Sequence, residues 1–310
     1  MELLDLTITP TGNISDFKPD LFIAASGYEA RSVLIPKSLN NPGRRKIALA
    51  YTEYTKEFSR RENDLYFKNN DYELIYSPGF RGPDFHTVFN GYEEKELKIL
   101  IDISVMTRNW YHALLKYINT TRHFSKLTVR AVYCPVLMEE SVELRRKIIY
   151  DKVHLIENVR DTGRETKATA LILGLGSEIE LGNTVFEKLK PKHTTLLYAD
   201  SIQMKQYVEN VFINNHALIE RISIRNLIGY PLNNPWEIYK ILLNLILPLR
   251  MDYQITIVPE GPKILSLITM LLQFNYPDIE LIIPRFKVKQ LKEGVPFHEF
   301  TYIDLKFGIE

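Results

Sequence analysis

A cluster of four polar side chains lies at the end of an apolar run in the first half of the sequence, and its hydroxyl and arginine groups are suited to binding phosphate. The run covers residues 99–103, and the side chains are Asp102, Ser104, Thr107 and Arg108. A run of this length is typical of a buried parallel strand, with a helix behind it. Open α/β sheets bind ligands at the carboxyl ends of such strands, where free helix amides stabilise anions. Because an arginine adds a fixed charge and a bidentate donor, we predict a phosphate or nucleotide site.

A simpler interpretation assigns part of this cluster to helix capping. Asp102 and Ser104 are residue types that accept hydrogen bonds from the first amides of a helix. Capping alone does not require Arg108, so the phosphate interpretation explains more of the cluster.

Composition limits the class of protein. The chain has 310 residues, of which 45% are hydrophobic and 25% charged, with a formal net charge of +1. This length accommodates two ordinary domains in a soluble globular protein. A charge so close to zero gives no bulk attraction toward duplex nucleic acid or an anionic membrane, but it is compatible with a small phosphorylated ligand.

Cysteine usage and the apolar segments favour a cytoplasmic protein with no membrane partner. A single cysteine, Cys134, excludes intrachain disulfides and cysteine-rich zinc sites. Residues 1–10 contain acidic positions and lack the apolar core of a signal peptide. Residues 236–249 form the most apolar helical stretch, but it is too short to span a bilayer.

Two series of alternating strands and helices are expected. In the first series, strands are predicted at residues 3–8, 20–26, 46–52, 72–76, 99–103, 127–133 and 153–158, and helices at 56–69, 84–90, the segment after 108, and 138–147. In the second series, strands are predicted at residues 168–173, 194–199, 220–225, 253–258, 279–284 and 300–306, and helices up to 190, at 236–249 and at 264–274. Alternation of this kind predicts mostly parallel sheets with right-handed crossovers.

The two series indicate an internal duplication. Gly27 and Gly176 are 149 residues apart (176 − 27), and Glu29 and Glu178 have the same separation (178 − 29). The basic residues after strand four, Arg108 and Lys263, are 155 apart (263 − 108). We therefore predict an α/β fold of two tandem Rossmann-like lobes with pseudo-twofold duplication. The polar run at 160–167 divides lobe one (residues 1–160) from lobe two (161–310).

The order of strands decides where a ligand would bind. If each sheet has the order 3-2-1-4-5, its topological switch point lies between strands one and four. The loops after those strands carry the polar clusters: residues 27–32 and 102–108 in lobe one, and 174–178 and 259–263 in lobe two. We expect a ligand cleft where the carboxyl edges of the two lobes meet.

The pattern of residues 102–108, with an acid, a hydroxyl two positions later and a base at the end, resembles a motif of the CRISPR-associated Rossmann-fold (CARF) domains. A fused pair of such lobes resembles the SAVED domains of bacterial antiviral signalling, which are CARF-derived pseudo-dimers. The resemblance covers the layout of nearly the whole chain and implies a cyclic oligonucleotide ligand. Lobe two departs from the motif, since Ile257 and Pro259 replace the acid and the hydroxyl and only Lys263 keeps the basic end.

The predicted ligand-binding residues lie in these four loops. They are Gly27, Tyr28, Glu29, Arg31, Asp102, Ser104, Thr107, Arg108, Gly176, Ser177, Glu178, Glu260, Gly261 and Lys263. Phosphate contacts are expected from Ser104, Thr107 and Arg108 in lobe one. In lobe two they are expected from Gly176, Ser177 and Lys263.

Two groups of side chains have both a binding and a structural interpretation. Glu29 is suited to an adenine amino group or a ribose hydroxyl, or equally to the start of a helix. Tyr28, Phe80, Arg81 and Trp110 are suited to stacking on bases, although most aromatic residues belong to cores.

The pair Gly174 and Gly176, with Asp200 further on, has part of a dinucleotide-binding pattern. Ile179 occupies the position of its third glycine. A tight turn that needs glycine is the better interpretation.

Catalytic signals are few, so no catalytic residue, metal or cofactor is assigned. Known nucleophile, zinc and P-loop motifs are absent from the sequence, and His86 and His112 fit structural positions in helices. We expect a nucleotide sensor in antiviral defence that acts through a partner protein or self-association. The alternatives are a metal-independent ring nuclease, a nucleotide-processing enzyme using Glu29 or Asp102, and a scaffold with vestigial clefts. Clefts filled by side chains would favour the scaffold.

Overall fold

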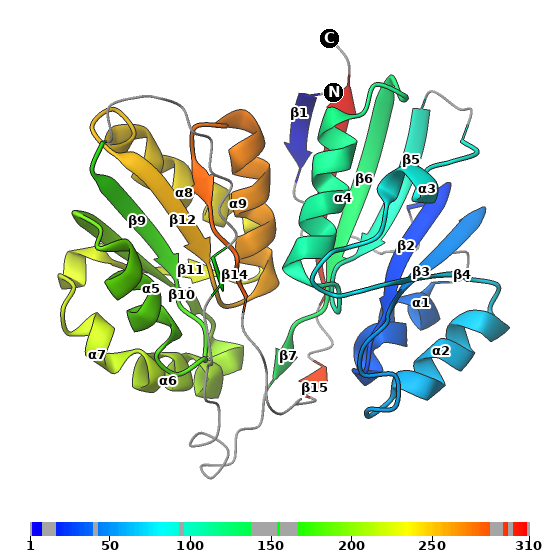
Figure 1. Cartoon of the computed structure of the whole chain (residues 1–310), viewed down its shortest axis with the longest axis horizontal. Helices are drawn as coiled ribbons and strands as arrows, with labels where there is room; N and C mark the ends of the chain where they lie inside the picture. The colour runs from blue at the N-terminus through cyan, green and yellow to red at the C-terminus, as the bar shows by residue number, and fades with distance from the viewer. Residues whose placement is uncertain are drawn as a thin grey trace. The chain divides into compact units, whose positions relative to one another are not determined.

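The computed structural model describes residues 2–7, 17–39, 43–92, 96–137, 154–155, 167–285, 294–296 and 300–308. The chain divides into two compact units (Figure 1). Unit one comprises Met1–Val136 and Glu293–Glu310, and unit two comprises Leu137–Lys292. Each unit is an α/β structure built on its own sheet.

Unit one contains a seven-stranded sheet in the order β1-β16-β6-β5-β2-β3-β4. The strands are β1 (Glu2–Thr7), β2 (Leu21–Ser26), β3 (Arg45–Tyr51), β4 (Glu73–Ser77), β5 (Glu96–Asp102), β6 (Lys126–Tyr133) and β16 (Thr301–Gly308). The strands from β6 to β4 are parallel, whereas β16 runs antiparallel to both β6 and β1.

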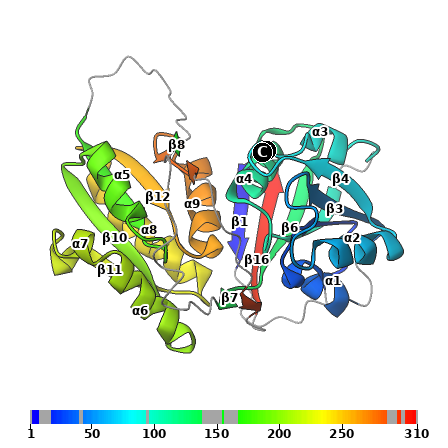
Figure 2. The same ribbon diagram turned by 60° about the horizontal axis from the view of Figure 1, so that its bottom comes forward.

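The helices of unit one cover both faces of this sheet. They are a 3₁₀ helix at Ala30–Val33, α1 (Leu34–Ser38), α2 (Arg60–Asn69), α3 (Phe85–Val88) and α4 (Arg108–Thr120). Figure 2 shows α1 and α2 on one face and α3 and α4 on the other. Helix α4 buries Trp110, Tyr111, Leu114, Leu115 and Ile118, a spacing that forms one apolar stripe.

Unit two contains a five-stranded parallel sheet in the order β11-β10-β9-β12-β13. The strands are β9 (Thr169–Gly174), β10 (His193–Asp200), β11 (Leu227–Pro231), β12 (Gln254–Pro259) and β13 (Glu280–Leu281). The α-helices are α5 (Leu181–Leu189), α6 (Lys205–Asn214), α7 (His216–Ile219), α8 (Pro235–Leu249) and α9 (Lys263–Asn275). Short pairings join β8 (His154–Leu155) to β14 (Pro284–Arg285), and β7 (Val136–Leu137) to β15 (Val295–Pro296).

The first parallel strand of each sheet is the centre of its core. All six residues of β2 are buried, and so are five of the six residues of β9. Phe22 and Ala24 of β2 belong to a hydrophobic core cluster of unit one. Leu171 and Leu173 of β9 belong to a corresponding cluster of unit two. Burial of a leucine or phenylalanine side chain contributes about 1.5–3 kcal/mol, so these strands anchor their units.

Both sheets contain the predicted strand order 3-2-1-4-5. Counting from the first parallel strand, unit one reads β4-β3-β2-β5-β6 and unit two reads β11-β10-β9-β12-β13. The α/β fold class with two mostly parallel, Rossmann-like lobes is therefore confirmed. Strands one and four are neighbours in each sheet, which sets a switch point at their carboxyl ends.

The third strand of unit two was predicted in the wrong segment. Residues 220–225 form a turn and the start of a 3₁₀ helix at Ile224–Asn226, and the side chain of Ile224 is 78% exposed. The strand is β11, which contains Gly229 and Pro231. These residue types weakened its pattern, but Pro231 is tolerated at the end of an edge strand.

The last predicted strand, at 300–306, belongs to unit one and not to lobe two. Strand β16 pairs with β6 along eight residues, from Thr301 opposite Tyr133 to Gly308 opposite Lys126. The chain therefore leaves unit one after β6, forms unit two, and returns to extend the first sheet. An antiparallel strand needs no crossover helix, so local sequence does not reveal which sheet it joins.

Some predictions fall on residues outside those described. The helix at 138–147 and most of the boundary run at 160–167 lie there, and only His154–Leu155 of the strand at 153–158 is described. Within the ranges that the structure describes, no helix combines the length and apolarity needed to cross a bilayer.

The returning strand is fastened by an ion pair whose removal should be measurable. Arg130 donates to Asp304 from Nε at 2.6 Å and from a terminal nitrogen at 2.7 Å, and both side chains are largely buried. We expect Asp304→Asn to lower the free energy of unfolding by about 1–3 kcal/mol in urea titrations. Glu96→Gln is the control, because Glu96 and Lys126 form an exposed pair at 3.7 Å worth at most about 1 kcal/mol. Equal losses in the two variants would contradict this expectation.

Candidate functional site

The loop after β2 is held in place by α2. The buried Asn63 side chain donates to the carbonyl oxygens of Gly27 (3.0 Å) and Glu29 (2.8 Å). The backbone amide of Ser59 donates to the carbonyl of Tyr28 (3.0 Å). Three consecutive carbonyl groups are therefore satisfied, which fixes the conformation of a loop that leaves the sheet edge.

Arg31 connects this loop to the end of β6. Its guanidinium donates to Glu29 through two nitrogens (2.8 and 3.3 Å) and to the carbonyl of Cys134 (2.6 Å). Burial lowers the pKa of the Arg31 guanidinium, but Glu29, together with the nearby Tyr133 and Cys134, offsets this, so the pKa lies above its ordinary value. In this conformation Arg31 and Glu29 stabilise the loop, as a buried ion pair with a satisfied fork.

Asp102 and Ser104 build the turn after β5. Oδ1 of Asp102 accepts a hydrogen bond from the backbone amide of Ser104 (2.9 Å), and Oγ of Ser104 accepts one from the amide of Cys134 (2.9 Å). Both side chains are completely buried. Neither one caps α4, because the cap is Thr107, whose hydroxyl accepts from the amide of Trp110 (3.4 Å).

Thr107 and Arg108 lie where α4 begins. The hydroxyl of Thr107 also donates to the carbonyl of Gly79 (2.9 Å), which ties the helix to the loop after β4. Arg108 is the first residue of α4 and is partly exposed. Of the three residues expected to hold phosphate in lobe one, Arg108 is the one that combines charge with access at the sheet edge.

Tyr51, at the end of β3, fills the space between these loops. Its hydroxyl donates to the carbonyl of Val105 (2.7 Å) and accepts from the amide of Thr107 (2.8 Å). Its ring stacks on Trp110 with centroids 4.0 Å apart and lies 3.3 Å from where a Cβ on Gly79 would be. Burial raises the pKa of Tyr51, so the phenol stays neutral. Tyr51 therefore closes the space between the loops of unit one, and sequence patterns did not identify it.

In unit two the corresponding loops touch through their backbones. Gly261 has a φ of +91°, and a Cβ there would lie 2.6 Å from the carbonyl oxygen of Leu175. A Cβ on Gly174 would lie 2.5 Å from the carbonyl oxygen of Glu260. Glycine is required at both positions because two backbones approach closely. The tight-turn interpretation of Gly174 and Gly176 is not confirmed, because neither residue has a positive φ; at Gly174 the close approach of the Glu260 backbone is what requires glycine.

Asparagine side chains also hold the first loop of unit two. Asn215 donates to the carbonyl of Gly176 (2.9 Å), and Asn214 donates to that of Ser177 (2.5 Å). Asn63 has the same role in unit one and lies 151 residues before Asn214 (214 − 63). The duplicated loops thus share a buried amide clamp. A helical asparagine carries no motif, so sequence reasoning missed it.

Lys263 occupies the same position in unit two as Arg108 in unit one. Each is the first residue of the 13-residue helix that follows strand four. Both side chains are partly exposed. In the loop after β9, Ser177 and Glu178 are partly exposed, whereas Glu260, after β12, is buried.

The aromatic candidates differ in their availability. Trp110 is completely buried, and its indole Nε1 donates to the carbonyl of Pro78 (3.0 Å), so it belongs to the core. Phe80 is 57% exposed and Arg81 is also exposed. Tyr28 is partly buried against Tyr54 and Phe58, which lie in the loop after β3.

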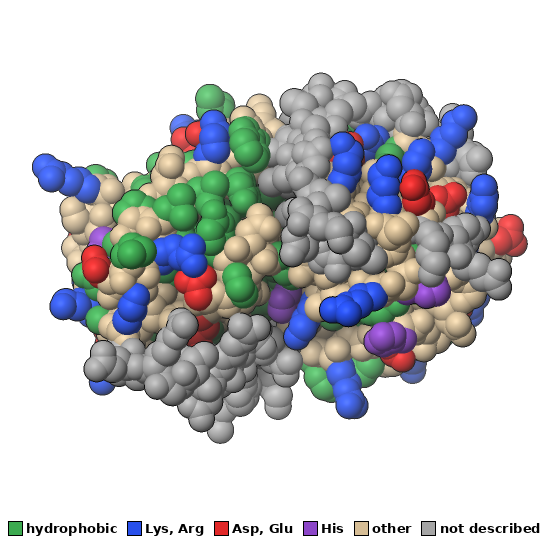
Figure 3. Space-filling view, turned by 90° about the horizontal axis from the view of Figure 1, so that it is seen from above, with side chains coloured by type: hydrophobic (Ala, Val, Ile, Leu, Met, Phe, Trp, Pro, Cys, Tyr) green, Lys and Arg blue, Asp and Glu red, His purple; other side chains and the backbone are tan. Residues whose placement is uncertain are grey.

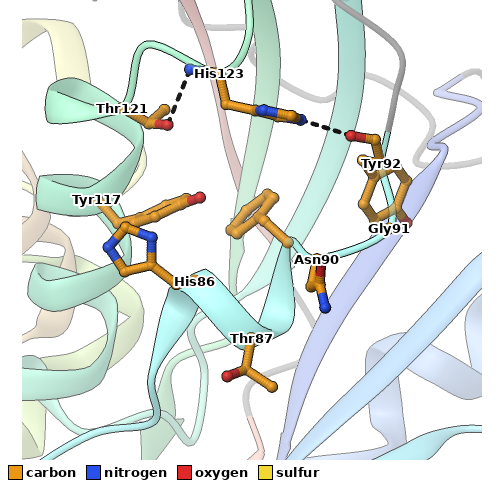
Figure 4. Close-up of a pocket in the computed structure, with 9 residues that line it drawn as sticks. His86, Thr87, Asn90, Gly91, Tyr92, Tyr117, Thr121 and His123 are labelled. Atoms are coloured by element: carbon orange, nitrogen blue, oxygen red, sulfur yellow. Dashed lines mark hydrogen bonds between the residues drawn. The ribbon is translucent and has the colours of Figure 1, made fainter.

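A separate hollow of about 540 Å³ lies at the opposite edge of the first sheet, before β5 and β6 (Figure 4). It is lined by His86, Thr87, Phe89, Asn90, Gly91, Tyr92, Tyr117, Thr121 and His123. Nε2 of His123 lies 2.6 Å from the carbonyl oxygen of Tyr92 and must donate to it. Among the described residues that line this hollow, the basic side chains are the two histidines, His86 and His123.

The amino edge of unit two is apolar in part. Figure 3 shows hydrophobic side chains gathered on this face, and Leu247 and Met251, at the end of α8, are 45% and 75% exposed. This surface lies away from the loops that carry the candidate site.

Burial holds two further titratable side chains, His112 and Cys134, in their neutral forms. Burial, with Lys116 nearby, lowers the pKa of His112 to about 4, so its imidazole is neutral at pH 7. Burial raises the pKa of Cys134 to about 12, which keeps the thiol protonated. Among the described residues, no group of three or more His, Cys, Asp or Glu is placed to hold a metal ion.

Comparison with known proteins adds no assignment. The sequence matches no protein-family model, and no curated protein is detectably similar to it.

The amide clamp of unit one can be tested by truncation. Asn63→Ala removes two buried hydrogen bonds and should lower the free energy of unfolding by about 2–3 kcal/mol in urea titrations. Asn70→Ala is the matched control, because Asn70 makes one exposed side-chain bond, to the carbonyl of Tyr66 (2.8 Å). Equal losses in the free energy of unfolding for the two variants would mean that the Asn63 hydrogen bonds do not stabilise the loop.

The backbone approach in unit two can be separated from the cost of a positive φ. Gly261→Ala introduces both a left-handed alanine and a clash, whereas Gly91→Ala, at φ +86°, meets no atom within 4 Å. Left-handed backbone costs about 1–2 kcal/mol in each variant. Calorimetry should show a clearly larger loss of stability for Gly261→Ala, and an equal loss would mean that the loops separate readily.

Proposed function

We propose that this protein binds a nucleotide at the carboxyl edge of its sheets and acts as a sensor. The observation that carries the proposal is the shared position of Arg108 and Lys263. Each begins the helix after strand four, at the switch point of a sheet with the order 3-2-1-4-5. Ligands of open α/β sheets bind at this point of the topology.

The electrostatics of both helix starts favour an anion. The first amides of α4 and α9 supply partial positive charge, and the basic side chain adds a full charge. Within these two described helices, the first turn carries no acidic residue.

The rim geometry restricts how the ligand is held. Because Tyr51 occupies the space between the loops of unit one, phosphate would contact Arg108 and the start of α4 from outside. In unit two it would contact Lys263 beside the loop at Ser177. Ser104 is enclosed and would support the turn without touching the ligand.

The resemblance to CARF and SAVED domains supports a specific ligand class. Under this proposal the ligand is a cyclic oligonucleotide or a related second messenger in prokaryotic antiviral defence. Binding would favour one conformational state of the protein, and a partner protein or self-association would carry the signal.

One observation favours a second candidate function. The packing of Tyr51 against Trp110, with both ends of its hydroxyl bonded, is that of a filled crevice. A scaffold with vestigial nucleotide sites would have this feature.

A binding screen decides between these functions. The purified protein is incubated with cyclic di-, tri- and tetranucleotides, its melting temperature is measured, and the mixture is then chromatographed. A sensor should show a higher melting temperature with an intact ligand. Cleaved products would replace the sensor by the ring nuclease, and no shift with any nucleotide would leave the scaffold.

Charge-removing variants test the assigned cations. Arg108→Ala and Lys263→Ala should each weaken binding of the identified nucleotide about 10- to 100-fold, measured by calorimetric titration. Lys116→Ala and Lys188→Ala remove exposed charges elsewhere on α4 and α5 and should leave affinity unchanged. Unchanged binding in both test variants would overturn the proposed phosphate contacts.

A further inference from the structure

Three aromatic rings gather at the carboxyl edge of unit one. The centroid of Tyr28 lies 6.1 Å from that of Tyr54 and 5.8 Å from that of Phe58. Tyr54 is 47% exposed and Phe58 is 50% exposed. Large apolar rings with this exposure, in contact with one another, need a reason beyond core packing.

The backbone at two of these rings adopts an unfavourable conformation. Tyr54 has a φ of +55° and Phe58 a φ of +41°, which costs each residue about 1–2 kcal/mol relative to ordinary backbone. Glycine or asparagine would adopt this conformation more easily. Strained non-glycine residues cluster at functional sites, where the surrounding structure enforces the conformation.

Hydrogen bonds hold the strained loop closed. The amide of Glu57 donates to the carbonyl of Tyr54 (3.3 Å), and the amide of Arg60 donates to the carbonyl of Glu57 (3.0 Å). The buried Arg60 guanidinium donates to the carbonyl of Glu53 (3.2 Å) and to Asp64 (2.9 Å). The rings of Tyr54 and Phe58 are therefore presented by a fixed loop.

The same network joins this loop to the switch point. Ser59 donates its amide to the carbonyl of Tyr28 (3.0 Å), and Asn63 holds the residues on either side. Tyr28 directly follows Gly27, whose Cβ position lies 3.5 Å from the ring of Tyr51. The three rings thus border the rim where the proposed nucleotide would lie.

The two exposed rings, Tyr54 and Phe58, are not stacked in parallel on Tyr28. Tyr28 and Tyr54 meet edge to face at 80°, and Tyr28 and Phe58 are tilted by 39°. In contrast, Tyr51 and Trp110 cover each other at 13°. A planar ligand can stack on an aromatic face that is exposed to solvent.

We propose that Tyr28, Tyr54 and Phe58, defined here as the aromatic platform, bind a base of the nucleotide by stacking. This inference rests on the proposed function and names the part of the ligand held in unit one. Exposed polar residues surround the platform, among them Thr55, Lys56 and Glu57. The small apolar area fits a planar base better than an apolar protein surface.

The test uses a double variant that removes the rings and also relieves the strain. Tyr54→Gly with Phe58→Gly should melt no lower than the wild type, because glycine accepts a positive φ. Calorimetric titration should show at least about 10-fold weaker binding of adenosine, guanosine, cytidine or uridine monophosphate, whichever the wild type binds. Binding of inorganic pyrophosphate, which has no base, should not change.

Two matched controls isolate the rings from other effects. Asp71→Gly relieves a positive φ of +59° elsewhere in unit one without removing a ring. Tyr76→Leu removes an aromatic ring that is 53% exposed on β4. Neither control should change the affinity for nucleotide.

The outcomes separate this inference from the function on which it rests. Unchanged nucleotide affinity in the double variant overturns the platform but leaves nucleotide binding intact. Loss of nucleoside monophosphate binding in the double variant, with pyrophosphate bound by neither protein, supports the platform and overturns the phosphate site. If the wild type binds no nucleoside monophosphate, both fail. If the rings are needed for binding of a protein partner and not for binding of a nucleotide, the platform is not a base site.

Discussion

In each unit the order of strands reverses beside the first parallel strand, which is β2 in unit one and β9 in unit two, and the rest of the unit depends on this constraint. Strands β2 and β9 are buried along nearly their whole length because helices cover both faces of a parallel sheet. The connection that follows each strand goes to one side of the sheet, and the strand added on the other side is the fourth. Two loops must therefore diverge at the carboxyl edge, and polar residues accumulate there, with those that are buried bonded to the backbone of the loops.

The two units close the space between their diverging loops in different ways. Unit one places the ring of Tyr51 there and satisfies its hydroxyl at both bonding positions. Unit two lets two backbones meet at Gly174 and Gly261, where a side chain would not fit. Both solutions close the crevice itself and leave the helix starts, with Arg108 and Lys263, on the accessible rim.

Buried amides make this edge rigid in both units. Asn63, Asn214 and Asn215 satisfy loop carbonyl groups that would otherwise be costly to bury. The same need explains Asp102 and Ser104, whose side chains bond to backbone amides inside the turn. Several residues with the chemistry of a ligand site therefore stabilise the loops that present it.

The sequence by itself determined the fold class, the duplication and the equivalence of Arg108 with Lys263, because buried strands and helix periodicity are local patterns. It also located the loops of the switch points, since polar residues directly follow the strands. Only the tertiary structure decided which side chains reach the rim. Burial of Ser104, the position of Tyr51 and the cluster of Tyr28 with Tyr54 and Phe58 all depend on contacts between distant segments. The assignment of β16 to the first sheet is of the same kind, because pairing of an antiparallel strand is a long-range choice that no local pattern encodes.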